Sequence, residues 1–569
     1  MGLVAELTPS PTEDIDRKVW QLRENAERFA RASIGDKLGW LYQVRERVGR
    51  LAERWARATC EHTRVDFDSP VAGEAWILGP GATLRTLRLL SGALYEVQQQ
   101  GVTRLRNKPY RLDNGQQVVP LFPSAAYDHG LLPGVRAEVR LDATLPGDDI
   151  PRASFYQLPR PEGRVALVLG AGNVSSIPAL DVLHKLFIEG QVVVLKMNPV
   201  NAYVGPILEQ AMKPLIDQGC LQIVYGGAEV GRELCDHEQV NEIHITGSDR
   251  THDAIVWGED KAERDRRRAQ NDPKLTKRIT SELGNVTPVV VVPGPYSERQ
   301  IQAIAESLCG MVTQNASFNC VSAKMLVMAR GWRGGQRLLD AMARIFERVP
   351  PRYAYYPGAQ ERYNALTRDR ANVQTFGRGA EGSLPWTLVR GLDENDPNTL
   401  QFRMEPFCSI LNLVELGETD PAAFLDRATS FCNDKLWGTL NAVLFVHPSH
   451  LKEGALASEV ETATRRLRYG AIGINQWAAV SYALGSTPWG GHPSSTLADI
   501  QSGRGWAHNT AMLEGIEKCV VTGPLVSPIR PLWSPLHQTL HTTGRHLCDF
   551  EAEPDVWRLS KLAMSALRG

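Results

Sequence analysis

The sequence predicts an α/β protein of two or three domains built on parallel sheets. Its 569 residues are too many for a single hydrophobic core. From residue 164 onward, short apolar strands alternate with helical segments, which is typical of parallel sheets with helices on both faces. The composition, 43% hydrophobic and 22% charged, is that of an ordinary globular protein.

The first 150 residues divide into a helical part and a strand-bearing part. Trp20, Leu22, Ala26 and Phe29 recur at helical spacing, and residues 38–60 continue the pattern with charges on the other face. Later come an Asn-Gly turn, several prolines and the alternating stretch GVRAEVRLDAT, which predicts a strand.

Strands and helices then alternate. RVALVLGAGN predicts a buried strand, IPALDVLHKLFIEG a helix closed by Gly190, and QVVVLKMNP the next strand. LQIVYGG and NEIHITGS continue the series, and TPVVVVPG opens a second α/β region that runs to about residue 500. Residues 258–278 are densely charged, and we interpret them as an exposed insertion or solvated helix, with a binding patch as the alternative.

Charge and cysteine content exclude several classes of protein. With 63 basic and 64 acidic residues, the chain gives no reason to expect nucleic acid or a membrane as partner. Nine scattered cysteines without a CxxC pair predict neither disulfides nor a metal site, and they indicate a reducing cytoplasm. The N-terminus lacks the features of a signal peptide, and Glu6 stands where myristoylation after Gly2 needs Ser or Thr.

Three residues are candidates for chemistry. Cys320 lies in NASFNCVSAK, Glu282 in ITSELGN, and Asn173 just beyond a buried strand, where α/β sheets hold their ligands. Each has a structural alternative. A lone cysteine is usually a small buried apolar residue, the glutamate could be a solvated loop acid, and the asparagine could be a helix cap.

The order of motifs decides between these interpretations. The chain shows GAGN, VVVLKMNP, HITGS, ELGN, NASFNC, MEPFCSI and NQWAAVSYALGSTPWGG in succession between about residues 160 and 500. This series resembles the aldehyde dehydrogenase superfamily in order and nearly in spacing. The resemblance implies an aldehyde dehydrogenase-like α/β fold, with a Rossmann-type cofactor domain, an α/β catalytic domain and a small oligomerisation element.

The resemblance also implies how the chain is divided. The expected parts are a cofactor domain (1–130 and 151–285), a catalytic domain (286–500), an oligomerisation element (131–150 and 505–522) and a C-terminal extension (523–569). In this family the last strand of the element adds to a neighbouring subunit's sheet, so we expect a homodimer or homotetramer. Apolar residues in the extension predict that it packs on its own or a neighbouring subunit, namely Leu525, Leu532, Trp533, Leu536, Trp557 and Leu562.

Catalytic roles follow residue by residue from the resemblance. Cys320 matches the nucleophile and Glu282 the acid that activates water. Asn173 matches the amide that, with the backbone N–H of the nucleophile, stabilises the alkoxide. The thiol reacts well only as a thiolate, and hydrolysis of the resulting thioester needs a base poised near neutral pH.

The cofactor implied is NAD or NADP. Lys196 matches the lysine at the adenosine ribose, and Gly247 and Ser248 match the start of the pyrophosphate-binding helix. Glu405 matches the acid at the nicotinamide ribose and Phe407 the aromatic beside the ring. The residues after Lys196 include no acid of the kind that favours NAD, so both cofactors stay open.

The sequence departs from the family pattern beside the nucleophile, where Ser317 and Phe318 replace the usual Gly-Gln. The predicted activity is oxidation of an aldehyde to an acid through a Cys320 thiohemiacetal and thioester. A CoA-acylating dehydrogenase or acyl-CoA reductase is the alternative within the family, and Glu282 argues against it. The intact set of catalytic residues argues against a non-catalytic binding protein, and balanced charge argues against a scaffold built on residues 258–278. The sequence does not name the aldehyde.

Overall fold

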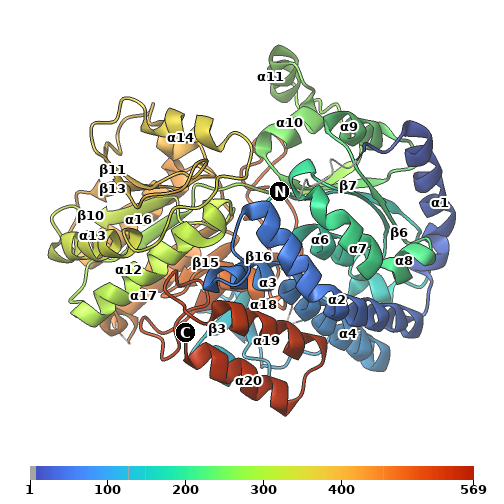
Figure 1. Ribbon diagram of the computed structural model, residues 1–569, viewed down its shortest axis with the longest axis horizontal. Coiled ribbons are helices and arrows are strands. Elements are labelled where there is room, and N and C mark those ends of the chain that lie inside the picture. Colours follow the sequence, from blue (N-terminus) through green and yellow to red (C-terminus); the bar gives the residue numbers. More distant parts are fainter. Residues whose placement is uncertain (1–7, 126, 146, 148, 453) are drawn as a thin grey trace.

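The computed structural model describes residues 8–125, 127–145, 147, 149–452 and 454–569. The interpretation of Gly2 and Glu6 lies outside these residues. In the described part of the chain, the strands form a five-stranded and an 11-stranded sheet, which lie side by side (Figure 1). None of the described helices is long and apolar enough to cross a membrane.

The five-stranded sheet is wholly parallel and has the order β6-β5-β4-β7-β8. Its strands are β4 (Val165–Leu169), β5 (Val192–Lys196), β6 (Leu221–Val224), β7 (Glu242–Gly247) and β8 (Arg278–Leu283). Successive residues of β5 are all buried, so helices cover both faces of the sheet. This arrangement confirms the predicted α/β class. Glu282 lies within the last strand rather than in a loop.

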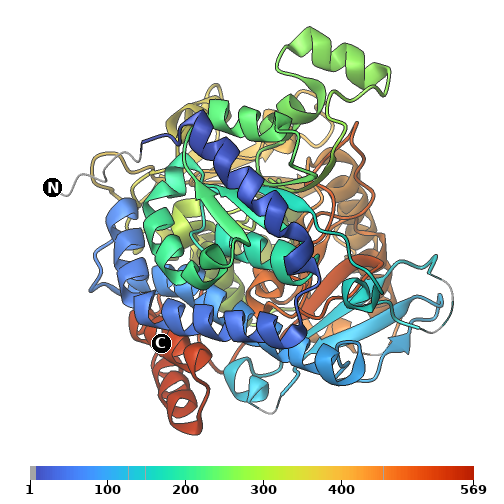
Figure 2. The same cartoon turned by 90° about the vertical axis from the view of Figure 1, so that its right-hand side faces the viewer.

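Of the helices in the N-terminal half, α1 and α6 pack directly on β5. The N-terminal helices are α1 (Thr12–Ala30), α2 (Ile34–Thr63), α3 (Gly73–Trp76), α4 (Ala82–Gln100), α5 (Asp128–Leu131), α6 (Ile177–Phe187), α7 (Gly205–Ala211), α8 (Lys213–Asp217), α9 (Ala228–Asp236), α10 (Asp249–Trp257) and α11 (Lys261–Ala269). The predicted helical N-terminus is therefore two long helices: α1 packs on the sheet, and α2 packs on other helices, among them α4 and α7 (Figure 2).

The larger sheet has the order β1-β2-β3-β16-β15-β14-β9-β10-β13-β12-β11. Its strands are β1 (Tyr110–Arg111), β2 (Gln117–Phe122), β3 (Arg136–Leu141), β9 (Pro288–Val291), β10 (Met325–Ala329), β11 (Val373–Phe376), β12 (Trp386–Leu392), β13 (Ile410–Leu416), β14 (Asn441–Phe445), β15 (Ala471–Ile474) and β16 (Ile516–Thr522). The helices of this half are α12 (Glu298–Thr313), α13 (Arg333–Phe346), α14 (Ala359–Thr367), α15 (Leu400–Arg403), α16 (Pro421–Lys435), α17 (Ala455–Arg466) and α18 (Ala479–Leu484). The domain boundaries given above stay a prediction.

The strand β16 corrects one expectation. It pairs in parallel with β15 and in antiparallel fashion with β3, so both of its edges are used within this chain. We expected this strand to add to a neighbouring subunit's sheet. Here it joins the predicted strand 136–141 to the chain's own large sheet instead, because the two stretches meet along nearly their whole length. The outer edge on this side belongs to β1.

The charged segment after α10 forms the helix α11, which projects from the molecule (Figure 1). None of its residues is buried. Ion pairs one turn apart link Lys261 to Asp265 at 2.6 Å and Arg267 to Glu263 at 2.9 Å. Such exposed pairs contribute little stability, and they agree with the interpretation as a solvated helix.

The C-terminal extension folds into α19 (Leu540–Ala552) and α20 (Val556–Leu567) and packs on its own chain, as one of its two predicted placements requires. Leu525 and Leu562 are buried, but Trp557 is 67% exposed, so the prediction was wrong for that side chain. Glu551, which is fully buried, holds the extension to α4 by accepting from Arg85 and Arg88 at 2.8 and 2.6 Å.

Candidate active site

Two cavities meet at the candidate nucleophile. The larger one, of about 1500 Å³, is lined by every residue predicted for catalysis and cofactor binding: Asn173, Lys196, Gly247, Ser248, Glu282, Cys320, Glu405 and Phe407. The second, of about 600 Å³, lies toward the C-terminal extension. Thr246, Glu282 and Cys320 line both. The structure therefore brings together residues that lie more than 200 positions apart in the sequence.

Cys320 follows α12 and precedes β10, at the junction of the cavities. Its backbone carbonyl accepts hydrogen bonds from Thr287 and Asn441, both at 3.2 Å, which fix the residue over the end of the sheet. The other eight cysteines are buried, whereas Cys320 is partly exposed. Among the cysteines, Cys320 is the one that lines both cavities.

The backbone just before Cys320 is strained. Asn315, Ala316 and Ser317 all have left-handed backbone angles, with φ of 51°, 53° and 71°. Each such residue costs about 1–3 kcal/mol unless its surroundings stabilise it. The Asn315 amide does so by donating to the carbonyls of Asn173 at 3.0 Å and Phe318 at 3.2 Å. The loop is thus held in one conformation around the nucleophile.

Lys324, which was not predicted as a site residue, also stabilises this loop. Its ammonium group donates to the carbonyl of Ser317 at 2.8 Å and to the hydroxyl at 3.1 Å. Burial lowers the pKa of Lys324 to about 8, and the negative charge of Glu405 opposes that shift. The sequence offered one signal, a lysine at the start of the apolar strand KMLVMA.

Asn173 contacts this loop directly. Its amide nitrogen donates to the carbonyl of Phe318 at 2.9 Å, and its own backbone carbonyl accepts from the Tyr355 hydroxyl at 2.9 Å. A side-chain amide has two N–H groups, and the contact with Phe318 uses one of them. The asparagine lies beyond β4, as predicted, and its partner Phe318 stands two positions before Cys320.

Glu282 is buried, and its carboxylate accepts a hydrogen bond from the indole of Trp489 at 3.3 Å. Burial raises the pKa of Glu282 to about 8, against the hydrogen bonds of Cys320 and Trp489. Burial also raises the pKa of the Cys320 thiol, and the nearby carboxylate of Glu282 adds to the shift. A carboxyl group with a pKa near neutrality beside a thiol can exchange protons with it or with water.

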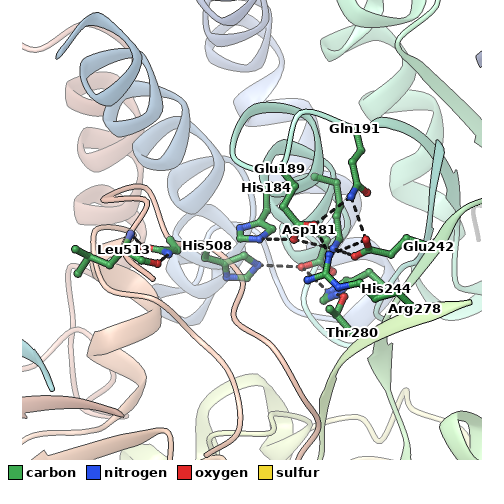
Figure 3. Close-up of polar contacts among 12 residues, drawn as sticks. Asp181, His184, Glu189, Gln191, Glu242, His244, Arg278, Thr280, His508 and Leu513 are labelled. Atoms are coloured by element: carbon green, nitrogen blue, oxygen red, sulfur yellow. Dashed lines mark hydrogen bonds and ion pairs between the residues drawn. The ribbon is translucent and has the colours of Figure 1, made fainter. Parts of the chain in front are cut away.

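A buried polar network surrounds Asp181 (Figure 3) and reaches the strand that carries Glu282. Thr246 is the direct neighbour of Glu282 across β7 and β8, and its hydroxyl donates to Asp181 at 2.9 Å. Asp181 also bonds the imidazole of His508 at 3.0 Å. Sequence reasoning missed Asp181 and His508. An acid inside the apolar helix IPALDVLHKLF was the available signal.

The far end of the larger cavity suits an anionic ligand. Gly247 ends β7, and Ser248 caps α10 by accepting the backbone N–H of Thr251 at 3.2 Å. The N-terminus of a helix favours phosphate groups because its N–H groups and dipole point outward. Lys196 ends β5 beside it, and burial lowers the pKa of this lysine to about 8.

The near end carries Glu405 and Phe407. One carboxylate oxygen of Glu405 is buried without a hydrogen-bond partner in the described part of the chain. A Cβ at Gly284 would lie 2.1 Å from the other oxygen, which explains the glycine of ELGN. Burial raises the pKa of Glu405 to about 7, and Lys324 opposes the shift. The ring of Phe407 lies 5.8 Å from that of Phe318.

Part of the chain is similar to known aldehyde dehydrogenases. Residues 142–343 match the model of the aldehyde dehydrogenase family. The chain is 28% identical over 158 residues to 4-trimethylaminobutyraldehyde dehydrogenase A of Danio rerio, covering 26% of this chain and 27% of that one. It is 27% identical over 191 residues to N-succinylglutamate 5-semialdehyde dehydrogenase 1 of Caulobacter vibrioides, covering 33% and 37%. The matches thus span less than two fifths of these relatives.

The fold extends the likeness to most of the chain. The structure of an NAD-dependent aldehyde dehydrogenase from Sinorhizobium meliloti superposes with a TM-score of 0.61 at 17% identity, covering 90% of this chain and 88% of that one. An NADP-dependent glyceraldehyde-3-phosphate dehydrogenase from Bacillus halodurans, complexed with NADP, gives 0.61 at 15% identity, covering 90% and 91%. Family model, relatives and fold agree with the resemblance of the motifs: residues 142–343 are similar to the aldehyde dehydrogenase family, and most of the chain has the fold of solved aldehyde dehydrogenases.

Proposed function

We propose that the protein oxidises an aldehyde to a carboxylic acid with NAD or NADP as the electron acceptor. One observation carries the proposal: Cys320 and Glu282 line both cavities, so a ligand in either cavity can reach the same thiol and carboxylate. The similarity of residues 142–343 to the aldehyde dehydrogenase family supports the reaction class.

Each group then has a chemical task. Cys320 gives its proton to Glu282 and attacks the aldehyde carbon, forming a thiohemiacetal alkoxide. The free N–H of the Asn173 amide and the backbone N–H of Cys320 stabilise that oxygen. The carbon–hydrogen bond breaks, its hydride leaves and a thioester remains on Cys320. Glu282 releases the thiol's proton to solvent before water attacks the thioester. It then takes the water's proton and passes it to the leaving thiolate, so that the acid and the thiol are released.

The residues present fit a nicotinamide dinucleotide, which accepts the hydride when bound. The N-terminus of α10, with Gly247 and Ser248, suits the pyrophosphate. Lys196 suits the adenosine ribose, and the unpartnered oxygen of Glu405 suits a ribose hydroxyl. Phe407 offers an aromatic face beside it. No acid stands at residues 197–199, so the proposal covers NAD and NADP.

An aldehyde panel assayed with NAD and NADP in parallel tests the proposal. We expect reduced cofactor and carboxylic acid in equal amounts, and no turnover in Cys320→Ser, because a hydroxyl is a far weaker nucleophile. Acid formation must not require CoA. If turnover appears only when CoA is added, and an acyl-CoA accumulates, the CoA-acylating alternative replaces the hydrolytic one.

The proposal also covers assembly and location. We expect a homodimer or homotetramer in the cytoplasm. The exposed apolar side chains of α20 support an assembly, and nine cysteines without a disulfide support a reducing compartment. Light scattering at micromolar concentration should give two or four times the 63.0 kDa chain mass. A mass of one chain would contradict the assembly.

A further inference from the structure

The second cavity runs along one face of α12. The residues that this helix contributes to the lining are spaced by three and four, and they are Arg299, Gln302, Ala303, Glu306 and Ser307. Beyond the end of the helix the lining continues through Gln314 to Cys320. From Arg299 to Gln314 the helix axis rises roughly 20 Å. The cavity is therefore a channel that leads from the nucleophile toward the first turn of α12.

The C-terminal extension forms the facing wall. It contributes residues 524–533 and the inner side of α20, including Leu562 and Leu567. Trp533 lies on α12, where a Cβ at Gly310 would come within 2.1 Å of its carbonyl oxygen. Its indole donates to Ser307 at 3.1 Å.

Trp533 also joins the extension to the nucleophile region. Its ring lies 5.8 Å from that of Trp477, whose indole donates to the carbonyl of Val321, next to Cys320, at 2.8 Å. Arg530 fastens the same segment to α12 through Glu306 at 2.8 Å. The wall is thus held to the middle of α12 and to the region of the nucleophile.

Apart from Glu282 at the nucleophile and Arg299 at the outer end, the described lining residues offer no free charge to an ionic substrate. Its other charged side chains are bonded to neighbouring groups: Glu74 to Arg352, Arg85 to Glu551, Asp128 to the backbone of Ser124, Asp181 to His508, and Glu306 to Arg530. Among the described lining residues, Arg299 has no such contact, and it is exposed at the outer end. Most of the remaining surface is apolar, with Trp477, Val480, Leu484 and Leu525 as examples.

We propose that this channel binds the apolar tail of a medium- or long-chain aliphatic aldehyde, with the carbonyl at Cys320 and the tail along α12 beneath the extension. This inference rests on the proposed aldehyde oxidation and names its substrate class. A volume of about 600 Å³ is in the range of sites that enclose small organic ligands. Burial of each methylene between α12 and the extension favours a longer chain, and a charged tail would lose its hydration without gaining a partner.

A series of unbranched aldehydes tests the substrate class. We expect kcat/KM to rise about threefold to fourfold for each added methylene until the channel is full, because each buried methylene adds binding energy. Succinic semialdehyde, which carries a carboxylate, should be a poor substrate at any concentration. A flat chain-length profile, or a preference for succinic semialdehyde, would overturn the inference and leave the proposed oxidation standing.

A blocked channel tests the placement. Ala303→Phe puts a ring into the channel away from Cys320, and it should lower the ratio of kcat/KM for decanal to that for propanal by about tenfold or more. Ala303→Ser nearly keeps the volume and should keep the ratio. An unchanged ratio in Ala303→Phe would place the tail elsewhere.

Binding without turnover separates the two claims. Decanamide has the same tail and cannot be oxidised. Isothermal titration should show that it binds the wild-type protein and binds Ala303→Phe at least tenfold more weakly, as overpacking predicts. If decanamide binds the wild-type protein and binds Ala303→Phe more weakly, but no aldehyde is oxidised, the result supports the channel and contradicts the proposed function. If aldehydes are oxidised and decanamide binds both proteins equally, the channel fails.

Discussion

At the scale of single residues, folding and the proposed reaction favour different protonation states of Glu282. A carboxyl group on a buried strand loses its hydration, and burial raises its pKa to about 8. The indole of Trp489 donates one hydrogen bond to this carboxyl group, which replaces part of the lost hydration. The folded protein therefore prefers the protonated acid, while the proposed hydrolysis needs the carboxylate. The compromise is a group that changes its charge close to neutral pH.

Substitution of Glu282 by glutamine should separate the two half-reactions. We expect one equivalent of reduced cofactor per site, formed more slowly because the thiol has lost its proton acceptor, and then a steady rate lower by on the order of 10²–10⁴, because the water that cleaves the thioester has lost its base. The steady rate should recover in part at high pH, where hydroxide replaces that base. Rapid mixing followed by steady-state assay measures both phases. Unchanged steady turnover would remove Glu282 from the reaction.

The same substitution should change the pH dependence of stability. In the folded protein the pKa of Glu282 is raised above its ordinary value of 4.5, because the fold favours the protonated carboxyl group. Its contribution to the free energy of unfolding is therefore fully present below pH 4.5 and is lost as the pH rises through about 8. Glu282→Gln cannot ionise. We expect it to melt a few degrees higher than the wild-type protein at pH 8 and with a smaller difference at pH 5. An equal difference at both values would mean that the carboxylate is better solvated than the structure implies.

We propose a different task for Glu405, because its unpartnered oxygen suits positioning of a ribose rather than proton transfer. Glu405→Gln keeps the shape of the side chain and removes its charge. We expect kcat to fall about tenfold or more, with a smaller change in the KM of the cofactor, since loss of orientation affects the reacting geometry most. Single-turnover kinetics should place the loss in hydride transfer. A change confined to KM would make Glu405 a simple binding residue.

At the scale of elements, the junction between α12 and β10 is the strained part of the site. Three successive residues with positive φ precede Cys320, and Ser317 stands where the family pattern has glycine. Glycine adopts such angles without steric cost, whereas a β-branched side chain does so very poorly. The bonds of Asn315 and Lys324 offset this strain.

A pair of substitutions at Ala316, whose φ is 53°, measures that strain. Ala316→Gly should raise the free energy of unfolding by up to about 1 kcal/mol, because it removes the steric cost of the left-handed backbone. Ala316→Val should lower it by about 2 kcal/mol or more, because Val adds branching and volume at a buried site. Denaturant unfolding measures both. Equal stability of the two variants would show that the loop relaxes in solution.

Local sequence predicted the small sheet well and the larger one in part. Strands β4 and β5 were visible as apolar runs bounded by turns. The strand β8 was not, because RITSEL carries polar residues that face its neighbour β7 and the cavity rather than a uniform core. The pairing of β16 with β3 of the same chain was also not predicted, since register between distant strands depends on the whole fold.

The sequence likewise indicated some residues of the candidate site and not others. The order of motifs singled out Cys320 and Glu282, because the chemistry limits which residue types can stand there. The residues that surround them were hidden. Asp181 meets His508 across 327 positions, and Glu282 meets Trp489 across 207. Nothing in the local pattern of either segment indicates such a partner.

At the scale of the whole molecule, one buried carboxylate bonds the C-terminal extension to α4. Glu551 bonds Arg85 and Arg88 of α4, and α19 packs on α2 and α3 (Figure 2). Loss of one member of a buried ion pair leaves its partner uncompensated. The extension should therefore loosen as a unit when this contact is broken.

We expect Glu551→Gln to destabilise the protein by about 3–5 kcal/mol and to speed proteolytic removal of residues 523–569. In the wild-type protein, burial raises the pKa of Glu551 but the two arginines lower it further, below its ordinary value of 4.5. The ionised group thus stabilises the fold above pH 4.5, and this is lost as the pH falls through the folded pKa. Glu46→Gln is the control, because the exposed Glu46–Arg50 pair should cost under about 1 kcal/mol. Equal proteolysis of both variants would contradict the prediction.

The meeting of two cavities at Cys320 has a kinetic consequence. A ligand that occupies the larger cavity does not cover the mouth of the channel under the extension, since the two share only Thr246, Glu282 and Cys320 among the described residues. Neither reactant has to wait for the other to enter, and the acid can depart while the reduced nucleotide is still bound. Initial-rate plots against both reactants should intersect, and the acid should inhibit competitively against the aldehyde but not against the nucleotide.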